Sequence, residues 1–343
     1  MSKRQKLSFF PLEDLPNEIL LKILSLLDIK EVLQCGRSSI RLRKISNDKS
    51  LWLKLNLTRR KVPYGFIEKA MQNGCEYLKL RNGCVDGGKN PKKSVPWKLK
   101  YLEISHSPYC KCDNREEVLQ NCHFLEKLAL ENITLKSRGI EQICQNGETL
   151  RILSLGPILL SPKLIQKLFT KCHQLTEVSL NFAWDMNYPH VCALVENLTP
   201  IILKLNLVIK EFKDEHVNTL VRRCRKITEL NLSETSITDD SVESIAAHLN
   251  SLEKLDVSFT NINTLLLLKS IPTLKILHFF GYHRKEDVEK IKNLKLQLPH
   301  ISINEDGDFF QIAGPTKKVN RSIDHDWFWE IRANQQDLFP RAR

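Results

Sequence analysis

A six-residue aliphatic pattern that returns about every 25 residues constrains the fold of this chain more than any other feature. It consists of an aliphatic residue, two variable residues, an aliphatic residue, one variable residue and a final aliphatic residue. The copies are LKYLEI from Leu99, LEKLAL from Leu125, LRILSL from Leu150, LTEVSL from Leu175, ILKLNL from Ile202, ITELNL from Ile227, LEKLDV from Leu252 and LKILHF from Leu274, with weaker ones, CEYLKL from Cys75 and LPHISI from Leu298. Ten copies at a nearly constant spacing indicate one repeated structural unit.

Most units also carry apolar residues at helical spacing ahead of the aliphatic pattern. The clearest sets are Ile165, Leu168, Phe169 and Cys172; Val191, Leu194, Val195 and Leu198; Val217, Leu220, Val221 and Cys224; and Val242, Ile245, Ala246 and Leu249. A period of two followed by a period of 3.6 predicts one strand and one helix per unit. A single unit cannot bury its own apolar side, so the units stack. The predicted fold is an α/β leucine-rich-repeat solenoid of about ten repeats, with parallel strands inside an arc and helices outside.

The remaining bulk properties fit a chain that is neither exported nor membrane-bound. Its 343 residues, 42% of them hydrophobic, are enough for one solenoid and a small additional module. No run of about 18 apolar residues occurs, so we expect no membrane span. The first residues, MSKRQKLSFFP, lack the apolar run of a secretory signal. We therefore expect the nucleus and cytoplasm, with the ten cysteines as reduced thiols.

Neither a metal site nor a catalytic site is predicted. Four cysteines fall on the buried stripe of successive helices: Cys122, Cys144, Cys172 and Cys224. The pair Cys110 and Cys112, near His106, lacks the second ligand pair of a typical zinc site. Phosphate-binding loops, dinucleotide fingerprints, zinc-protease helices and serine nucleophile elbows do not occur. We expect no cofactor, no metal and no catalytic residue, which leaves binding as the function of the solenoid.

The strand side chains that point into the arc form the predicted binding surface, because side chains alternate across a strand. Its candidate residues are Glu177, Asn181, Glu229, Asn231, Asp256, His278 and Phe280 on or beside the strands, Phe182, Glu234 and Phe259 at the rim, and Trp184 nearby. Acidic residues concentrate here although the chain carries a net charge of +12. This predicts a docking face for a protein with basic and aromatic groups. The alternative is an ordinary solvated polar surface.

The C-terminal tail, residues 304–343, is predicted to dock on the solenoid. It contains five large aromatic residues: Phe309, Phe310, Trp327, Phe328 and Trp329. Disordered tails are usually poor in aromatic residues. The tail therefore either caps the last repeat or folds back along the inner face of the arc.

Residues 9–56 form a separate N-terminal module whose first helix is apolar on nearly every side. Asp14 is a good helix N-cap, and Pro16 lies in the first turn where its missing N–H costs little. Two further short helices are predicted, in DIKEVLQCG and in RLRKISNDKSLW. Three helices in about fifty residues cannot bury all of these leucines internally. The remaining apolar face must be covered by the first repeat, by another protein, or by both.

The segments LPNEILLKILSLL, EVL and DKSLW resemble an F-box, and an F-box followed directly by repeats, here 57–303, resembles the F-box/leucine-rich-repeat (FBXL) family of ubiquitin-ligase receptors. DKSLWLKLNLT, LVRRCRKITELNLS, IPTLKILHFFG and LPHISIN followed by IAGPT are similar, in order, to segments of its S-phase kinase-associated branch. The resemblance implies a non-catalytic receptor whose F-box binds a Skp-type adaptor and, through it, a cullin and a RING subunit. The implied adaptor-binding residues are Leu15, Pro16, Ile19, Leu20, Ile23, Leu24, Leu27, Val32, Leu33 and Trp52.

The same resemblance implies what the repeats bind: a protein substrate for ubiquitination and proteasomal degradation, such as a phosphorylated cell-cycle regulator, and a small cyclin-dependent-kinase regulatory subunit on the C-terminal repeats. At the matching rim positions Phe182 keeps an aromatic residue and Glu234 an acid, whereas Phe259 replaces a basic residue. Two other functions stay open. One is a scaffold or inhibitor solenoid that never meets a ligase. The other is nucleic-acid binding driven by the basic charge, which the dispersed Lys and Arg residues disfavour.

Overall fold

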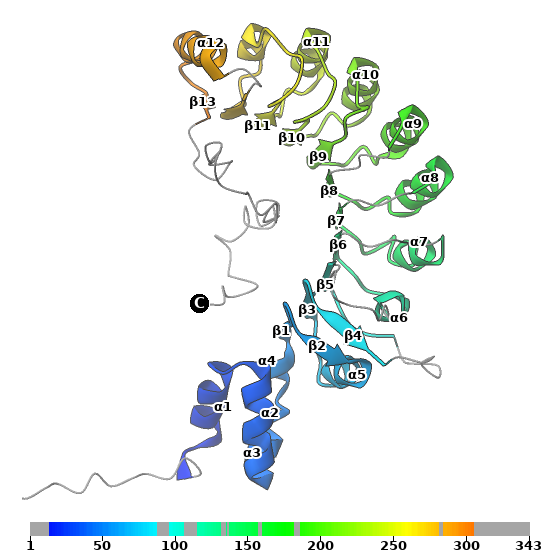
Figure 1. Cartoon of the computed structure of the whole chain (residues 1–343), viewed down its shortest axis with the longest axis vertical. Coiled ribbons are helices and arrows are strands. Elements are labelled where there is room, and N and C mark those ends of the chain that lie inside the picture. The colour runs from blue at the N-terminus through cyan, green and yellow to red at the C-terminus, as the bar shows by residue number, and fades with distance from the viewer. Residues whose placement is uncertain are drawn as a thin grey trace, which may run out of the picture.

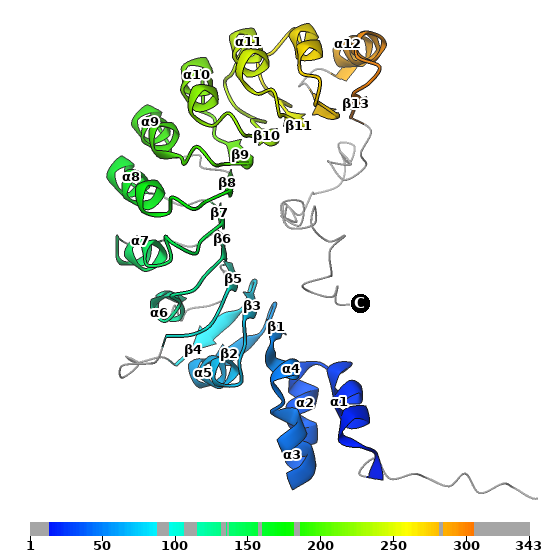
Figure 2. The same ribbon diagram turned by 180° about the vertical axis from the view of Figure 1, so that it is seen from behind.

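The computed structural model describes residues 14–87, 96–105, 115–131, 135, 137–156, 160–181, 186–280 and 284–304. Within these ranges the chain forms an open arc with a small helical module at its N-terminal end (Figure 1). Strands line the inner side of the arc and helices the outer side, as the view from behind also shows (Figure 2). The predicted leucine-rich-repeat solenoid is confirmed.

The N-terminal module consists of α1 (Asn17–Ser25), α2 (Ile29–Ser38), α3 (Ile40–Ser46) and the single turn α4 (Lys49–Trp52). The third predicted helix is thus divided in two, because the carboxylate of Asp48 accepts the backbone N–H of Ser50 and starts a new turn. The module has a small core of its own, made of Leu20, Leu24, Val32, Leu42 and Ile45.

All strands of the main sheet run parallel and follow chain order, with each strand hydrogen-bonded to the next repeat's strand. They are β1 (Lys54–Asn56), β3 (Tyr77–Leu80), β5 (Tyr101–Ser105), β6 (Lys127–Glu131), β7 (Ile152–Leu155), β8 (Glu177–Asn181), β9 (Lys204–Val208), β10 (Glu229–Asn231), β11 (Lys254–Asp256), β12 (Ile276–His278) and β13 (Ser302–Ile303). A side sheet pairs β2 (Lys61–Pro63) with β4 (Cys84–Asp86). Each repeat therefore covers the previous one along the whole arc.

The sheet starts one strand earlier than the sequence pattern predicts. β1 pairs in parallel with β3, with Lys54 opposite Tyr77. The segment WLKLNL from Trp52 has the repeat pattern except that tryptophan takes the first aliphatic position. Trp52 is fully buried in the solenoid core beside Leu55 and Leu57. The main sheet, eleven strands within the described residues, thus begins inside the range 9–56 predicted for the module.

The outer helices are α5 (Tyr64–Gln72), α6 (Arg115–Gln120), α7 (Ser137–Cys144), α8 (Pro162–Lys171), α9 (Tyr188–Asn197), α10 (Asp214–Arg223), α11 (Asp239–His248) and α12 (Arg284–Gln297). The predicted apolar stripes of α8 to α11 face the sheet. In the described residues between α11 and α12, the repeat has the 3-10 helix η2 (Leu266–Ser270) in place of an α-helix. Only 22 residues separate Leu252 from Leu274, the shortest spacing in the series, so little room remains for an α-helix.

One continuous core runs from Trp52 to Ile303, and polar contacts join it to the module. The indole N–H of Trp52 donates to the carbonyl oxygen of Ser46 at 2.7 Å. Arg60 donates to the Asp28 carboxylate, with 3.1 Å between Nη2 and Oδ2. None of the helices in the described ranges is long and apolar enough to cross a membrane.

Candidate functional site

The first candidate surface lies on α1, a helix that is apolar on both of its faces. The surface is the face of α1 that points away from the module core. Leu20 is 1% exposed and packs inward, whereas Ile19 is 41% exposed and Leu26 is 86% exposed. Ile23 is half-buried between them. Positions 19, 23 and 26 are separated by one helical turn each, so they form one stripe along the helix. We call Pro16, Ile19, Ile23 and Leu26 the α1 outer stripe.

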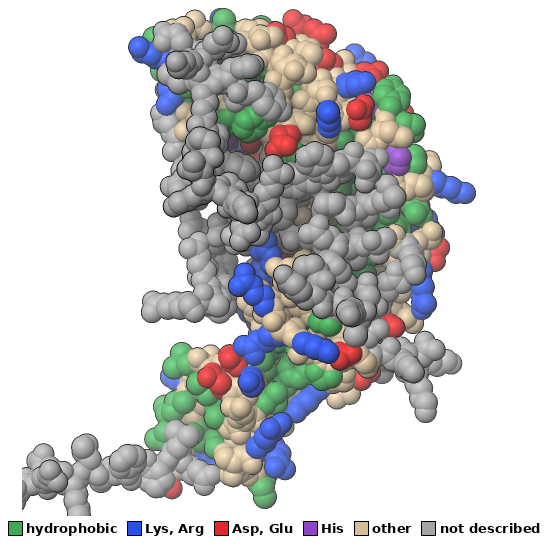
Figure 3. All heavy atoms as spheres, in the orientation of Figure 1, with side chains coloured by type: hydrophobic (Ala, Val, Ile, Leu, Met, Phe, Trp, Pro, Cys, Tyr) green, Lys and Arg blue, Asp and Glu red, His purple; other side chains and the backbone are tan. Residues whose placement is uncertain are grey.

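The α1 outer stripe contains the apolar side chains that the N-terminal module cannot bury internally. The helix cannot turn both of its apolar faces into the module, because the module core closes over Leu20 and Leu24 alone. Hydrophobic side chains gather on the exposed side of the module in the space-filling view (Figure 3). An apolar stripe left in water is the usual mark of a protein-binding surface.

Four of the predicted adaptor-binding residues do not lie on the surface of this chain. Leu20, Leu24, Val32 and Trp52 are all buried within this chain, the first three in the module core and Trp52 in the solenoid. Their side chains cannot contact a partner without unfolding. Of the other predicted residues, Pro16 and Ile19 are exposed, and Leu15, Ile23, Leu27 and Leu33 are half-buried.

Two exposed residues were missing from the predicted set. Leu26 lies on the α1 outer stripe, and its helical spacing from Ile19 and Ile23 is visible in the sequence. Ile40, at the first position of α3, is 73% exposed. No sequence pattern marks Ile40, because its exposure depends on how α3 packs against α1.

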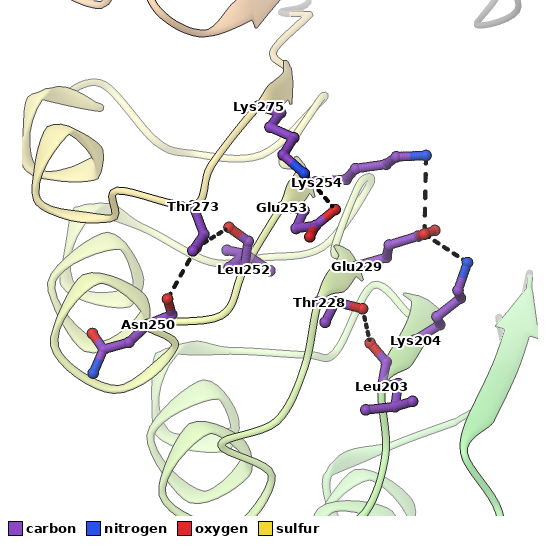
Figure 4. A network of polar contacts seen from close by, with 10 residues as sticks. All are labelled: Leu203, Lys204, Thr228, Glu229, Asn250, Leu252, Glu253, Lys254, Thr273 and Lys275. Atoms are coloured by element: carbon purple, nitrogen blue, oxygen red, sulfur yellow. Dashed lines mark hydrogen bonds and ion pairs between the residues drawn. The ribbon is translucent and has the colours of Figure 1, made fainter.

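The second candidate surface is the inner face of the sheet. At its C-terminal half, Glu229 lies between two lysines in the same register position on neighbouring strands (Figure 4). Its Oε1 lies 2.6 Å from the ammonium of Lys204 and 3.9 Å from that of Lys254. The Glu229 and Lys204 side chains are only 13% and 18% exposed. This acid is therefore neutralised within the chain.

The predicted acidic docking face therefore exposes less negative charge than the sequence suggests. Four inward-facing residues of the predicted set are buried: Glu177, Asn231, Asp256 and His278. Glu103, another inward acid, pairs with Lys79 at 3.1 Å. Open negative charge is correspondingly scarce along the described strands.

The pKa of Asp256 also reflects its burial. Burial is the largest influence on this carboxyl and raises its pKa above the ordinary value, against hydrogen bonds from Ser258. The Ser258 backbone N–H donates to Oδ1 at 2.9 Å, and His278 occupies the next register position. Asp256 therefore stabilises the turn after β11 rather than presenting charge to a ligand.

The rim of the inner face keeps accessible side chains. Glu234 is exposed, while Phe259 and Phe280 are half-buried. Glu234 and Phe259 share a left-handed backbone, with φ of 57° and 58°, and their N–H groups donate to the next repeat at Ser258 and Phe280. The repeat geometry thus projects both side chains from the same edge. Asn181 ends β8, whereas Phe182, Trp184 and the tail beyond residue 304 lie outside the described residues.

The predicted core cysteines Cys122, Cys172 and Cys224 are buried free thiols, while Cys144 is partly exposed. Burial raises the pKa of Cys224 to about 11, which keeps the thiol protonated. Cys84, by contrast, is disulfide-bonded, so the expectation that all ten cysteines are reduced is wrong there. Among the described residues no group of three His, Cys, Asp or Glu side chains is placed to hold a metal. His106, Cys110 and Cys112 lie outside those residues.

Two protein families match this chain. The SKP2 leucine-rich-repeat domain matches residues 65–336, and the F-box-like domain matches residues 12–58. Members of F-box/leucine-rich-repeat families are generally non-catalytic adaptors.

Three solved structures are also similar. The mouse RP105/MD-1 complex is 14% identical over 66% of this chain and 38% of that chain, with a TM-score of 0.45. An internalin (inlF) of Listeria monocytogenes is 16% identical over 61% of this chain and 69% of that one, with a TM-score of 0.39. The yeast Rad7 and Elc1 complex is 16% identical over 61% and 76%, with a TM-score of 0.30. This chain thus spans less than two thirds of the mouse chain's length.

Proposed function

We propose that this chain, which belongs to the SKP2 leucine-rich-repeat family and carries an F-box-like domain, is a substrate-recognition subunit of an SCF-type ubiquitin ligase. The two domains together support this role in general. The observation that carries it is the α1 outer stripe, an apolar surface on the F-box-like domain that the chain itself leaves in water. In this role the chain has no catalytic step of its own.

The proposed contact joins the α1 outer stripe, with the half-buried Leu15, Leu27 and Leu33 at its margin, to a Skp-type adaptor. A partner that covers Ile19 and Leu26 would remove two large apolar side chains from water, worth about 1.5–3 kcal/mol for each fully buried side chain. The adaptor would then connect the chain to a cullin and a RING subunit. The arc-shaped sheet would hold the substrate at a distance from that contact.

Co-purification with a Skp-type adaptor tests this contact. Leu26→Asp places a charge on the outer stripe, and we expect at least a tenfold loss of bound adaptor because an unpaired carboxylate would be buried. Leu296→Asp is the matched control, since Leu296 is 75% exposed on α12, at the opposite end of the arc. Wild-type amounts of adaptor on Leu26→Asp would argue against the proposal.

For the substrate side, we propose that the inner face and its rim bind a protein marked for ubiquitination and proteasomal degradation, such as a phosphorylated cell-cycle regulator in the nucleus or cytoplasm. The exposed Glu234 and the half-buried Phe259 and Phe280 are the proposed contact for a small cyclin-dependent-kinase regulatory subunit. Aromatic side chains beside a charge are frequent anchors of protein interfaces. Glu234→Arg should weaken binding of that subunit and leave adaptor binding unchanged. Unaltered binding would remove Glu234 from the contact.

A further inference from the structure

Two cysteines from neighbouring repeats lie next to each other on the outer side of the arc. Cys144 is the last residue of α7, and Cys172, 28 residues further along the chain, directly follows α8. These two helices lie side by side (Figure 1). Cys144 is half-buried, whereas Cys172 is fully buried. We call Cys144 and Cys172 the α7–α8 dithiol.

The C-terminal ends of α7 and α8 pack closely enough to bring the two side chains together. The Sγ of Cys144 donates to the carbonyl oxygen of Lys167 on α8 at 4.0 Å. Gly147 lies in the turn after α7, and a Cβ there would collide with the carbonyl oxygen of Lys171, the residue before Cys172. The absence of a side chain at Gly147 thus lets the end of α8 approach the end of α7.

Cys144 is the more acidic thiol of the pair. A hydrogen bond with Cys172 is the largest influence on the pKa of Cys144 and lowers it, and the cations Lys167 and Lys171 lower it further, against the effect of burial. The same hydrogen bond raises the pKa of Cys172, and burial adds to this effect. Glu141 pairs with Lys167 at 2.8 Å and offsets part of that cation's influence. The thiolate, which is the nucleophilic form of cysteine, therefore forms first at Cys144, where solvent can reach it.

Cys172 differs from two other cysteines that occupy the same position in their repeats. Cys122 and Cys224 also stand three residues before the aliphatic pattern of the next strand. The thiol of Cys122 donates to the carbonyl oxygen of Val118 at 3.1 Å, and that of Cys224 to the carbonyl oxygen of Thr199 at 3.5 Å. Packing in the core explains these two cysteines. Cys172, in contrast, contacts a second thiol that is partly open to solvent.

We propose that the α7–α8 dithiol is a site of reversible oxidation by hydrogen peroxide, at which an intramolecular disulfide ties two neighbouring repeats together. A disulfide forms only where two backbones approach closely, as the ends of α7 and α8 do. The cross-link closes a loop that contains β7 and α8, so it stabilises this part of the arc. The site uses no residue of the α1 outer stripe or of the inner face, and it does not depend on the ligase role.

The oxidation takes place in two steps. The thiolate sulfur of Cys144 attacks one oxygen of the peroxide, an S–O bond forms, the O–O bond breaks, and the leaving hydroxide takes a proton from solvent. The sulfur of Cys172 then attacks the sulfenic sulfur of Cys144, the S–S bond forms, the S–O bond breaks, and the hydroxide leaves as water with the Cys172 proton. Two thiols thus lose two electrons and two protons, and one peroxide is reduced to two waters. A reducing thiol reverses the reaction by exchange.

Mass spectrometry of the purified full chain after treatment with hydrogen peroxide tests the site. Remaining thiols are alkylated before digestion, and we expect Cys144 and Cys172 in one pair of cross-linked peptides that dithiothreitol separates. The cross-link should form at least tenfold faster than Cys35, a half-buried cysteine on α2, is oxidised. Cys144→Ser should abolish the cross-link and leave Cys172 reduced. Cys224→Ser is the matched control in the same repeat position and should leave the cross-link intact.

Two further variants separate the roles of the residues. Cys172→Ala removes the thiol that attacks second, so Cys144 should remain a sulfenic acid that dimedone captures. Lys171→Glu reverses a charge that favours the Cys144 thiolate and should slow cross-linking several-fold. Lys163→Glu, at the other end of α8, should not slow it.

Urea unfolding of the oxidised and the untreated chain measures the effect on the solenoid. Oxidation should raise the unfolding midpoint of the wild type and leave that of Cys144→Ser unchanged, so that an effect of any other cysteine is separated from this one. Three results overturn the proposal: no cross-linked peptide, equal oxidation rates at Cys144 and Cys35, or conversion of Cys144 to sulfinic acid while Cys172 stays reduced.

Discussion

Arg41 at the start of α3 donates a hydrogen bond from Nη2 to the carbonyl oxygen of Leu15 at 2.6 Å, just before α1 begins. The same guanidinium donates to the side-chain oxygen of Asn17 at 2.8 Å. Hydrogen bonds from one rigid group to these two residues fix the orientation of α1 relative to α3. The orientation of the α1 outer stripe therefore depends on a residue that is not itself on the stripe.

Replacing Arg41 tests that dependence. Arg41→Ala should lower the free energy of unfolding by about 1 kcal/mol and reduce adaptor affinity several-fold, although the apolar stripe is unchanged. Denaturant titration and adaptor pull-down measure the two effects. Arg225→Ala, which removes only a local contact with Arg222, should leave both unchanged. Full adaptor affinity in Arg41→Ala would show that α1 is held in place by other contacts.

The two faces of α1 should respond oppositely to truncation. Leu20→Ala should lower the free energy of unfolding by about 2–5 kcal/mol, because it leaves a cavity in the module core. Ile19→Ala, one residue earlier, should change stability by less than about 0.5 kcal/mol. Chemical denaturation followed by circular dichroism measures both. Equal losses would mean that Ile19 is part of a core.

Close packing between successive repeats predicts an effect at Gly147. A Cβ at this position would collide with the carbonyl oxygen of Lys171 in the next repeat. Gly147→Ala should therefore destabilise the solenoid by about 1–3 kcal/mol. Gly65→Ala is the matched control, because a Cβ there meets nothing within 4 Å and Gly65 lies in α5. That variant should be neutral or up to about 1 kcal/mol more stable. Thermal unfolding distinguishes the two.

Acid should weaken the solenoid through His216. Burial lowers the pKa of this histidine from 6.5, and its Nδ1 accepts the backbone N–H of Lys213 at 3.0 Å. The unfolded chain binds a proton below pH 6.5 while the folded chain resists it, so stability is full above pH 6.5 and falls as the pH drops toward the lower, folded pKa. The slope is at most about 1.4 kcal/mol per pH unit.

The variant His216→Gln isolates this contribution. Its free energy of unfolding should vary less between about pH 7.5 and pH 5 than that of the wild type, since no proton is taken up at position 216. An unchanged slope in His216→Gln would assign the acid sensitivity to other groups.

The repeat fold could be predicted from the sequence because its signal recurs. Every core aliphatic position has the same environment, so ten imperfect copies define the strand and helix periods together. The repeat pattern does not predict the first strand, because Trp52 stands where the pattern has an aliphatic residue. The burial of Trp52 follows only from its packing against Leu55 and Leu57. A single aromatic substitution was enough to hide one repeat.

The candidate surfaces were harder to predict, because exposure depends on neighbours that are distant in sequence. Leu20 and Ile19 look alike in a two-sided apolar helix, and only the packing of α2 and α3 separates them. The inner acids could be placed on strands, but their pairing with lysines 25 residues away required the register of the sheet. The stacking of Tyr77 on Tyr101, with ring centroids 4.3 Å apart, likewise depends on the register that pairs β3 with β5.

Calorimetric titration of the purified full chain with a Skp-type adaptor measures the central claim most directly. We expect saturable binding with a negative heat-capacity change, because apolar surface of α1 leaves water. That binding should disappear in Leu26→Asp and persist in Leu296→Asp. Absence of binding by the wild-type chain, or equally tight binding by Leu26→Asp, would contradict the claim that the outer face of α1 joins this chain to a ligase.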